Sequence, residues 1–330
     1  MKKVLLFSML LCTIFVLGCS KDNSKTVLSS FEKKVNKANS YTLNGVLEII
    51  NNEDSYKYDV SVSYKESDMY RVSLRNQAND HEQIILKNEE GVYVLTPSLN
   101  KSFKFQSEWP NNNSQTYLLA SLLDDITSDN KRTFEEVNGE FIYTTTVNYP
   151  NNRKLVNQKI YFDKDYMPTK VEVMDSNSIV MVRMTFNEIK INSNVDNKVF
   201  TLNDNMNVDS TNTTISNKIN SIVYPVFMPE NTYLSSKDVV AKSNGERVIL
   251  TFSGDNPFIL VEETATVEDE FSIVPMYGEP DILIDTVGAI SDSSVTWVSN
   301  GVEYYIASDV MSSSTLLEVA KSLSVLPVGK

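Results

Sequence analysis

Cysteine and histidine are scarce in this chain, which has two cysteines and one histidine in 330 residues. Cys12 and Cys19 both lie near the start, and His81 stands alone in the polar segment 79–82. Cys12 is expected to be removed with a cleaved N-terminal leader, and Cys19 is expected to carry lipid. The mature chain is therefore expected to have no disulfide framework and no thiolate metal site. The usual zinc sites also lack their ligands, so we predict no metal or other cofactor.

Recognisable catalytic motifs are missing as well. The sequence has no G-x-S-x-G, no Walker A and no H-E-x-x-H pattern. Asp124 and Asp125 are expected at a solvated helix end. Asp163 and Asp165 resemble the start of a calcium loop, but the residues that follow supply neither the next ligand nor the glycine. The sequence favours a binding protein over an enzyme, and an unrecognised cell-wall hydrolase with two carboxylates stays open as an alternative.

Positive charge is deficient: 30 lysines and arginines stand against 43 acidic residues, for a net charge of −13. This balance argues against a nucleic-acid partner, because such binding depends on neutralising phosphates. It also argues against flat adsorption to anionic lipid.

A single long apolar run occupies residues 4–17, directly after Lys2 and Lys3. It is shorter than the roughly 20 residues of a membrane-spanning helix. Together with Gly18 before Cys19, it predicts a signal peptide over residues 1–18 and lipidation of Cys19. We expect residues 19–25 to form a lipidated tether that holds the body at the outer face of the cytoplasmic membrane.

The remaining sequence predicts a mainly β, α+β protein. A helix is expected from residue 26, and from residue 42 the apolar period changes to two, with about ten strands up to residue 202. A helical insertion is predicted at 117–126. Residues 203–218 are rich in Asn, Asp, Ser and Thr and are predicted to be a linker. Residues 219–330, with a strand near 271–276 and a last helix, are predicted to be a smaller α+β domain.

Aromatic and β-branched residues line the apolar face of the first sheet. Most of them can pack a core beneath the helices. A strongly curved sheet that its helices cap incompletely would instead enclose an apolar cavity suited to a lipid or acyl chain. The candidate cavity residues are Tyr58, Val60, Val62, Tyr64, Tyr70, Val72, Phe103, Phe105, Tyr143 and Phe186.

Several short motifs carry a family resemblance. In the first domain they are Tyr70-Arg71-Val72, the run 91–97, Lys101-Ser102-Phe103-Lys104-Phe105, Trp109-Pro110, and Asp163 with Met167-Pro168. This region resembles the lipoprotein-carrier superfamily that includes LolA, LppX and RseB/MucB. It is more specifically similar to the membrane-anchored YdcC-like and GerS-related lipoproteins of Gram-positive spore formers. The second region, with Gly278-Glu279-Pro280 and Val295-Thr296-Trp297, resembles the DUF4367-like domain of unknown function.

The resemblance implies an open antiparallel half-barrel with a helical lid. It also implies an adaptor or regulator of sporulation or spore germination, in the forespore or mother-cell envelope, that binds a lipid, a lipoprotein or a protein such as a cell-wall amidase. A chain tethered at Cys19 cannot leave its membrane, so the shuttle function of LolA is not expected. The alternative is an RseB/MucB-like envelope-stress sensor that binds lipid and a signalling partner.

Overall fold

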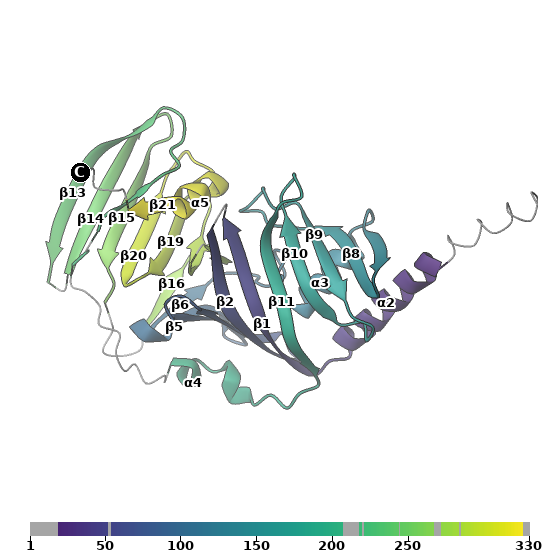
Figure 1. Cartoon of the computed structure of the whole chain (residues 1–330). Helices are drawn as coiled ribbons and strands as arrows, with labels where there is room; N and C mark the ends of the chain where they lie inside the picture. The colour runs from purple at the N-terminus through teal and green to yellow at the C-terminus, as the bar shows by residue number, and fades with distance from the viewer. Residues whose placement is uncertain are drawn as a thin grey trace, which may run out of the picture.

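The computed structural model describes residues 19–51, 54–206, 218–219, 221–243, 245–266, 272–283 and 285–325. The predicted signal peptide, residues 1–18, and most of the predicted linker, residues 207–217, lie outside these ranges. The described residues form a twelve-stranded sheet, a seven-stranded sheet and a two-stranded ribbon. The mainly β fold class is as predicted (Figure 1).

The first part of the chain contains α2 (Cys19–Asn36), β1 (Ser40–Asn51), β2 (Asp54–Lys65), β3 (Met69–Asn76), β4 (Glu82–Asn88), β5 (Gly91–Thr96), β6 (Lys101–Phe105), α3 (Leu119–Ser128), β7 (Thr133–Val137), β8 (Glu140–Thr146), β9 (Asn157–Phe162), β10 (Pro168–Met174), β11 (Val180–Ile191) and α4 (Leu202–Met206). The second part contains β12 (Val223–Pro225), β13 (Thr232–Lys242), β14 (Gly245–Gly254), β15 (Phe258–Thr264), β16 (Ser272–Met276), β17 (Glu279–Ile282), β18 (Val287–Ile290), β19 (Ser294–Ser299), β20 (Val302–Ala307), α5 (Ser313–Lys321) and β21 (Leu323–Val325).

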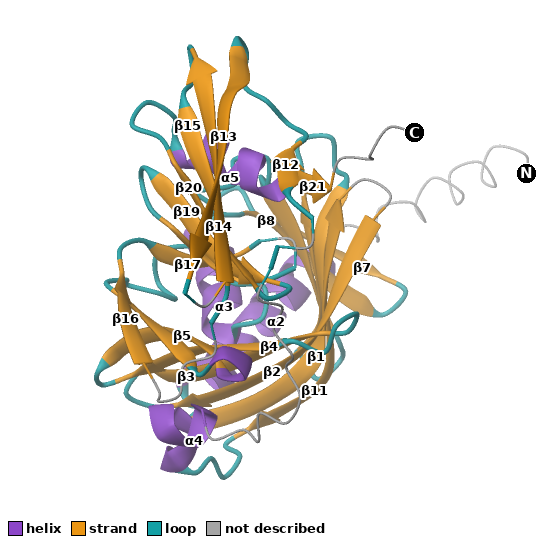
Figure 2. Cartoon of the chain, turned by 90° about the vertical axis from the view of Figure 1, so that its left-hand side faces the viewer, coloured by secondary structure: helices purple, strands orange, loops and turns teal. Residues whose placement is uncertain are grey.

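The large sheet follows from the period-two pattern of its strands. Alternate residues of a strand point to the same face, so the apolar residues of β1 and β2 share one side of the sheet. Leu43 lies opposite Val62, and Leu47 lies opposite Tyr58. Figure 2 shows β1, β2 and β11 curving around α2 and α3, whose apolar sides fill the concave face. The ring of Phe31 on α2 lies 5.1 Å from that of Phe162 on β9.

The N-terminal helix begins earlier than the sequence indicated. Residues 19–25, predicted to be a separate tether, form the first turns of α2. The Ser24 hydroxyl lies 3.0 Å from that of Tyr143, so this end of the helix is bonded to β8. The helix was missed because its first turns are polar and carry no apolar period.

The predicted linker also begins too early. Residues 203–206 belong to α4, and Met206 is only 7% exposed. It packs in a cluster with Tyr93 and Leu95, on the face of the sheet opposite α2 and α3. Its polar composition concealed this short helix, whose buried residues are Asn205 and Met206.

Strand β16 was predicted in the C-terminal domain, but it completes the first sheet. It pairs parallel with β6, where Ile273 lies opposite Ser102. The other C-terminal strands form the seven-stranded sheet in the order β13-β14-β15-β20-β19-β18-β17. The last helix is confirmed as α5, with Leu316 and Val319 buried against this second sheet.

The two parts of the chain share contacts and a core. Here residues 19–206 are called the first unit and residues 218–325 the C-terminal unit. The Gln83 side chain accepts hydrogen bonds from Thr286 Oγ1 at 2.8 Å and from Val287 N at 2.5 Å. Lys101 forms an ion pair with Glu303. Val287 and Ala289 are buried in the hydrophobic core of the first unit. The predicted two domains are therefore joined by side chains deep in the fold.

Candidate functional site

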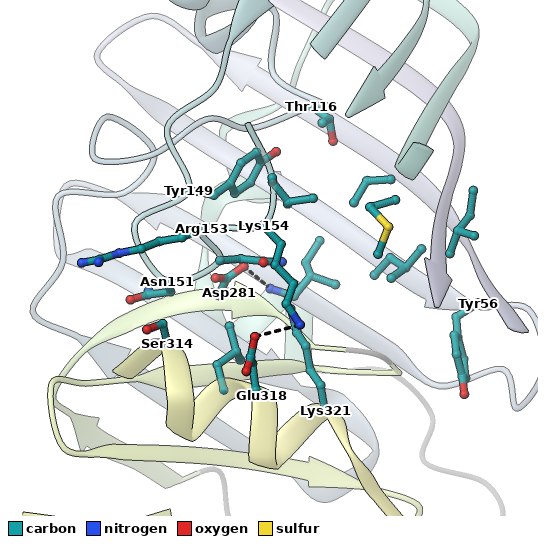
Figure 3. Close-up of a pocket in the computed structure, with 18 of the residues that line it drawn as sticks. Tyr56, Thr116, Tyr149, Asn151, Arg153, Lys154, Asp281, Ser314, Glu318 and Lys321 are labelled. Atoms are coloured by element: carbon teal, nitrogen blue, oxygen red, sulfur yellow. Dashed lines mark hydrogen bonds and ion pairs between the residues drawn. The ribbon is translucent and has the colours of Figure 1, made fainter. Parts of the chain in front are cut away.

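The main candidate site is a cavity of about 890 Å³ between the first unit and the C-terminal unit, here called the cleft. This volume lies in the range of small-molecule pockets, about 300–1,000 Å³. Figure 3 shows α5 along one side of the cleft and strands of the large sheet along the other.

The floor of the cleft is apolar and belongs to the ends of three neighbouring strands. Leu47 and Ile49 come from β1, Tyr56 from β2, and Met181 and Val182 from β11. Ile49 is opposite both Tyr56 and Val182, so the alternation that builds the core also brings these side chains together.

One wall is the loop before α3, and it is held by Asp125. This carboxylate accepts hydrogen bonds from Ser114 Oγ at 2.8 Å and from Gln158 Nε2 at 2.7 Å. Burial raises the pKa of Asp125 to about 6, although both hydrogen bonds act to lower it. The prediction of a solvated Asp124–Asp125 pair is correct for exposed Asp124 and wrong for partly buried Asp125. The pattern could not show this, because the bonding partners lie 11 and 33 residues away, outside the helix that carries Asp125.

Tyrosines stiffen the same wall. The Tyr117 hydroxyl donates to Gln115 Oε1 at 2.5 Å, and Gln115 Nε2 donates to Asn113 Oδ1 at 2.6 Å. Burial raises the pKa of Tyr117, and that of Tyr149 on the adjoining loop, well above the ordinary value. Both phenols are thus neutral, and they offer the cleft an apolar ring with a polar tip.

The opposite wall is charged. Glu318 on α5 forms an ion pair with Lys154 of the first unit, with 2.8 Å between Oε1 and Nζ. This pair links the two units across the cleft. Asp281 at β17 accepts the backbone N–H of Ile282 at 2.8 Å, and burial raises its pKa. Burial lowers the pKa of Lys321, while the nearby Asp281 carboxylate opposes that shift.

The predicted cavity residues lie elsewhere. All ten belong to the hydrophobic core of the first unit, either buried in it or packed against it. They are brought together as expected, but α2 and α3 occupy the space above them, and none of the ten lines the cleft. Tyr58 alone lines a second, much smaller pocket of about 40 Å³ beside Asp285 and Thr286. The cleft lies further along β1 and β2, beside the loop that precedes α3.

The sequence pattern did contain part of the cleft floor. Ile49 and Tyr56 continue the alternation of β1 and β2 to the hairpin end, which was a usable signal. No sequence signal placed the α5 side chains in the cleft, because their position depends on how the C-terminal unit packs. Cys19, the predicted lipidation site, is the first residue of α2.

The described part of the chain has neither a metal-binding cluster nor a membrane-spanning helix. Its His, Cys, Asp and Glu side chains form no group of three or more that could hold a metal ion. Among its helices, none has both the length and the apolar character needed to span a bilayer.

Comparison with known proteins identifies close sequence relatives. A family model described as "Sporulation protein YdcC-like" matches residues 1–200. The sporulation protein YdcC of Bacillus subtilis is 35% identical over 324 residues, which cover 97% of this chain and 96% of that protein.

Solved structures are similar at much lower identity. The MucA/MucB complex of Pseudomonas aeruginosa is matched over 90% of this chain and 98% of that chain, with 12% identity and a TM-score of 0.32. A LolA superfamily protein from Nitrosomonas europaea is matched over 54% of this chain and 97% of that chain, with 12% identity and a TM-score of 0.32. The complex of the CwlD amidase with the GerS lipoprotein from Clostridioides difficile is matched over 52% of this chain and 94% of that chain, with 14% identity and a TM-score of 0.22.

Proposed function

Because this chain belongs to the YdcC-like family of sporulation proteins, we propose that it is a non-enzymatic binding protein of the envelope of a spore-forming bacterium. Lipid on Cys19 would hold it at the outer face of the cytoplasmic membrane. From there it would act as an adaptor or regulator in sporulation or germination.

The cleft is the single observation that carries this proposal. Its floor of Leu47, Ile49 and Val182 is apolar, while its walls carry hydroxyl, amide and charged groups. A concave apolar surface with a few polar groups is the usual form of a ligand site. Both units contribute to it, so an occupant of the cleft would also affect how the C-terminal unit is held.

A protein partner is compatible with the same arrangement. Val226 and Phe227 line the cleft and are 67% and 40% exposed. Exposed apolar residues beside a pocket are a common feature of protein interaction sites. An envelope protein, such as a cell-wall amidase, could therefore contact these residues while a ligand fills the cleft.

The test is to obstruct the cleft in the cell. Ser314→Trp places a large ring on the cleft side of α5, and Ser29→Trp, exposed on α2 away from the cleft, is the matched control. We expect the first variant to lower the yield of heat-resistant spores toward that of a gene deletion, and the control to sporulate normally. Normal sporulation by a folded Ser314→Trp protein at wild-type abundance would refute a role for the cleft.

A further inference from the structure

The charges that line the cleft are not balanced. Three side chains are cationic and two are acidic, in a chain whose net charge is −13: Arg153, Lys154, Lys321, Asp281 and Glu318. Lys154 and Glu318 neutralise each other through their 2.8 Å ion pair. The excess positive charge therefore rests on the other two cations.

Lys321 is the more enclosed of these cations. It stands in the last turn of α5, is partly buried, and forms no hydrogen bond or ion pair with any residue that the structure describes. An ammonium group taken out of water needs a partner, because burial otherwise disfavours its charged form. An anion in the cleft would supply that partner.

Asp281 lies near Lys321 but does not meet this need. The two side chains interact electrostatically, yet the described residues include no ion pair between them at 4 Å or less. Burial raises the pKa of Asp281, so its charged form is disfavoured.

The apolar floor adds a second requirement. Leu47, Ile49 and Val182 form a continuous apolar surface across β1 and β11 within the cleft that also contains Lys321. Burying a methylene group on such a surface contributes about 0.8 kcal/mol. The occupant that satisfies both features has an apolar chain and an anionic end.

We propose that the cleft binds an amphiphile with one alkyl chain and an anionic headgroup, with the chain on this floor and the headgroup on Lys321. This inference rests on the proposed binding function and specifies the ligand. A carboxylate and a phosphate share the required chemistry, so a fatty acid and a single-chain phospholipid are both possible sources.

The experiment compares headgroups on one chain length. Purified protein from Ser20 to Lys330 is titrated by calorimetry with dodecanoate, dodecyl phosphate, dodecanol and dodecyltrimethylammonium below their micellar concentrations. We expect saturable binding of the two anions, at least about tenfold tighter than that of the alcohol or the cation. The stronger of the two anions identifies the source.

Variants then locate the headgroup. Lys321→Gln should weaken anion binding about tenfold and leave dodecanol binding unchanged, because only the charge is removed. Lys321→Arg should retain the preference for anions. Lys237→Gln, exposed on β13, is the control and should bind as the wild type does.

Three results would overturn the inference. Equal affinity for all four headgroups would refute anion selection but leave the proposed binding function intact. An anion preference that survives Lys321→Gln would remove the headgroup from this residue. No saturable binding of any amphiphile, with sporulation still lost in Ser314→Trp, would indicate a cleft for a peptide instead.

Discussion

Replacing Glu262 with glutamine should stabilise this protein at neutral and alkaline pH. Glu262 lies on β15 and is 0% exposed. Its two carboxylate oxygens lie 3.1 and 3.3 Å from the backbone nitrogen of Val223 on β12, which donates to them. Burial raises the pKa of Glu262 from 4.5 to about 7, and this hydrogen bond only partly offsets the shift.

The magnitude follows from the two pKa values. The folded protein favours the protonated form of Glu262. The free energy of unfolding therefore keeps its full contribution from this residue below pH 4.5, and that contribution is lost as the pH rises through 7. A shift of about 2.5 pKa units at about 1.4 kcal/mol per unit corresponds to about 3 kcal/mol. Glutamine has the shape of the protonated acid, can still accept from Val223, and never ionises.

The assay is urea-induced unfolding of wild type and Glu262→Gln at pH 5 and pH 8. We expect an advantage of only about 1 kcal/mol for the variant at pH 5 and one of up to about 3 kcal/mol at pH 8. Glu32→Gln, exposed on α2, should show no such pH-dependent difference. A variant that is less stable than wild type at pH 8, or one whose difference does not change with pH, would refute this account of the buried carboxylate.

Three further predictions concern the cleft wall, the contact between units and the anchor. Asp125→Ala removes the acceptor of two hydrogen bonds and should lower the free energy of unfolding by about 2 kcal/mol. Asp124→Ala, at an exposed position, should change it little, and equal effects of the two variants in urea unfolding would contradict this. Gln83→Ala should lower the free energy of unfolding by about 2 kcal/mol and speed proteolysis of the C-terminal unit. Gln77→Ala, at an exposed position, should do neither, and unchanged proteolysis of Gln83→Ala would show that this contact does not hold the units together. Cys19→Ala should move the protein from the membrane fraction to the soluble fraction on cell fractionation, and retention in the membrane would argue against lipidation.

The strand pattern could be predicted because it is a local property. The alternation from Tyr56 to Tyr64 identifies β2 and assigns its apolar face without knowledge of its neighbours. The same holds for α3 and α5, whose apolar residues recur at helical spacing. The YdcC-like family was also predictable, since several different short family motifs are spread along residues 1–200.

The use of each apolar face could not be predicted in the same way. Tyr70 and Phe105 have the composition of either a core or a cavity wall, and only the position of α2 and α3 decides that they form a core. Asp125 has the sequence context of a solvated helix end, but Ser114 and Gln158 make it an internal brace. In both cases the deciding partner is distant in sequence.

By itself, the sequence determined the mainly β class, the scarcity of thiol and imidazole groups, and the acidic charge, because each depends only on composition or near neighbours. The tertiary structure decided that β16 joins β6 of the first unit and that Lys321 of α5 lines the same cleft as Ile49 of β1. Both arrangements bring together segments more than 150 residues apart. Such contacts are set by the packing of whole sheets and helices, and no local period encodes them.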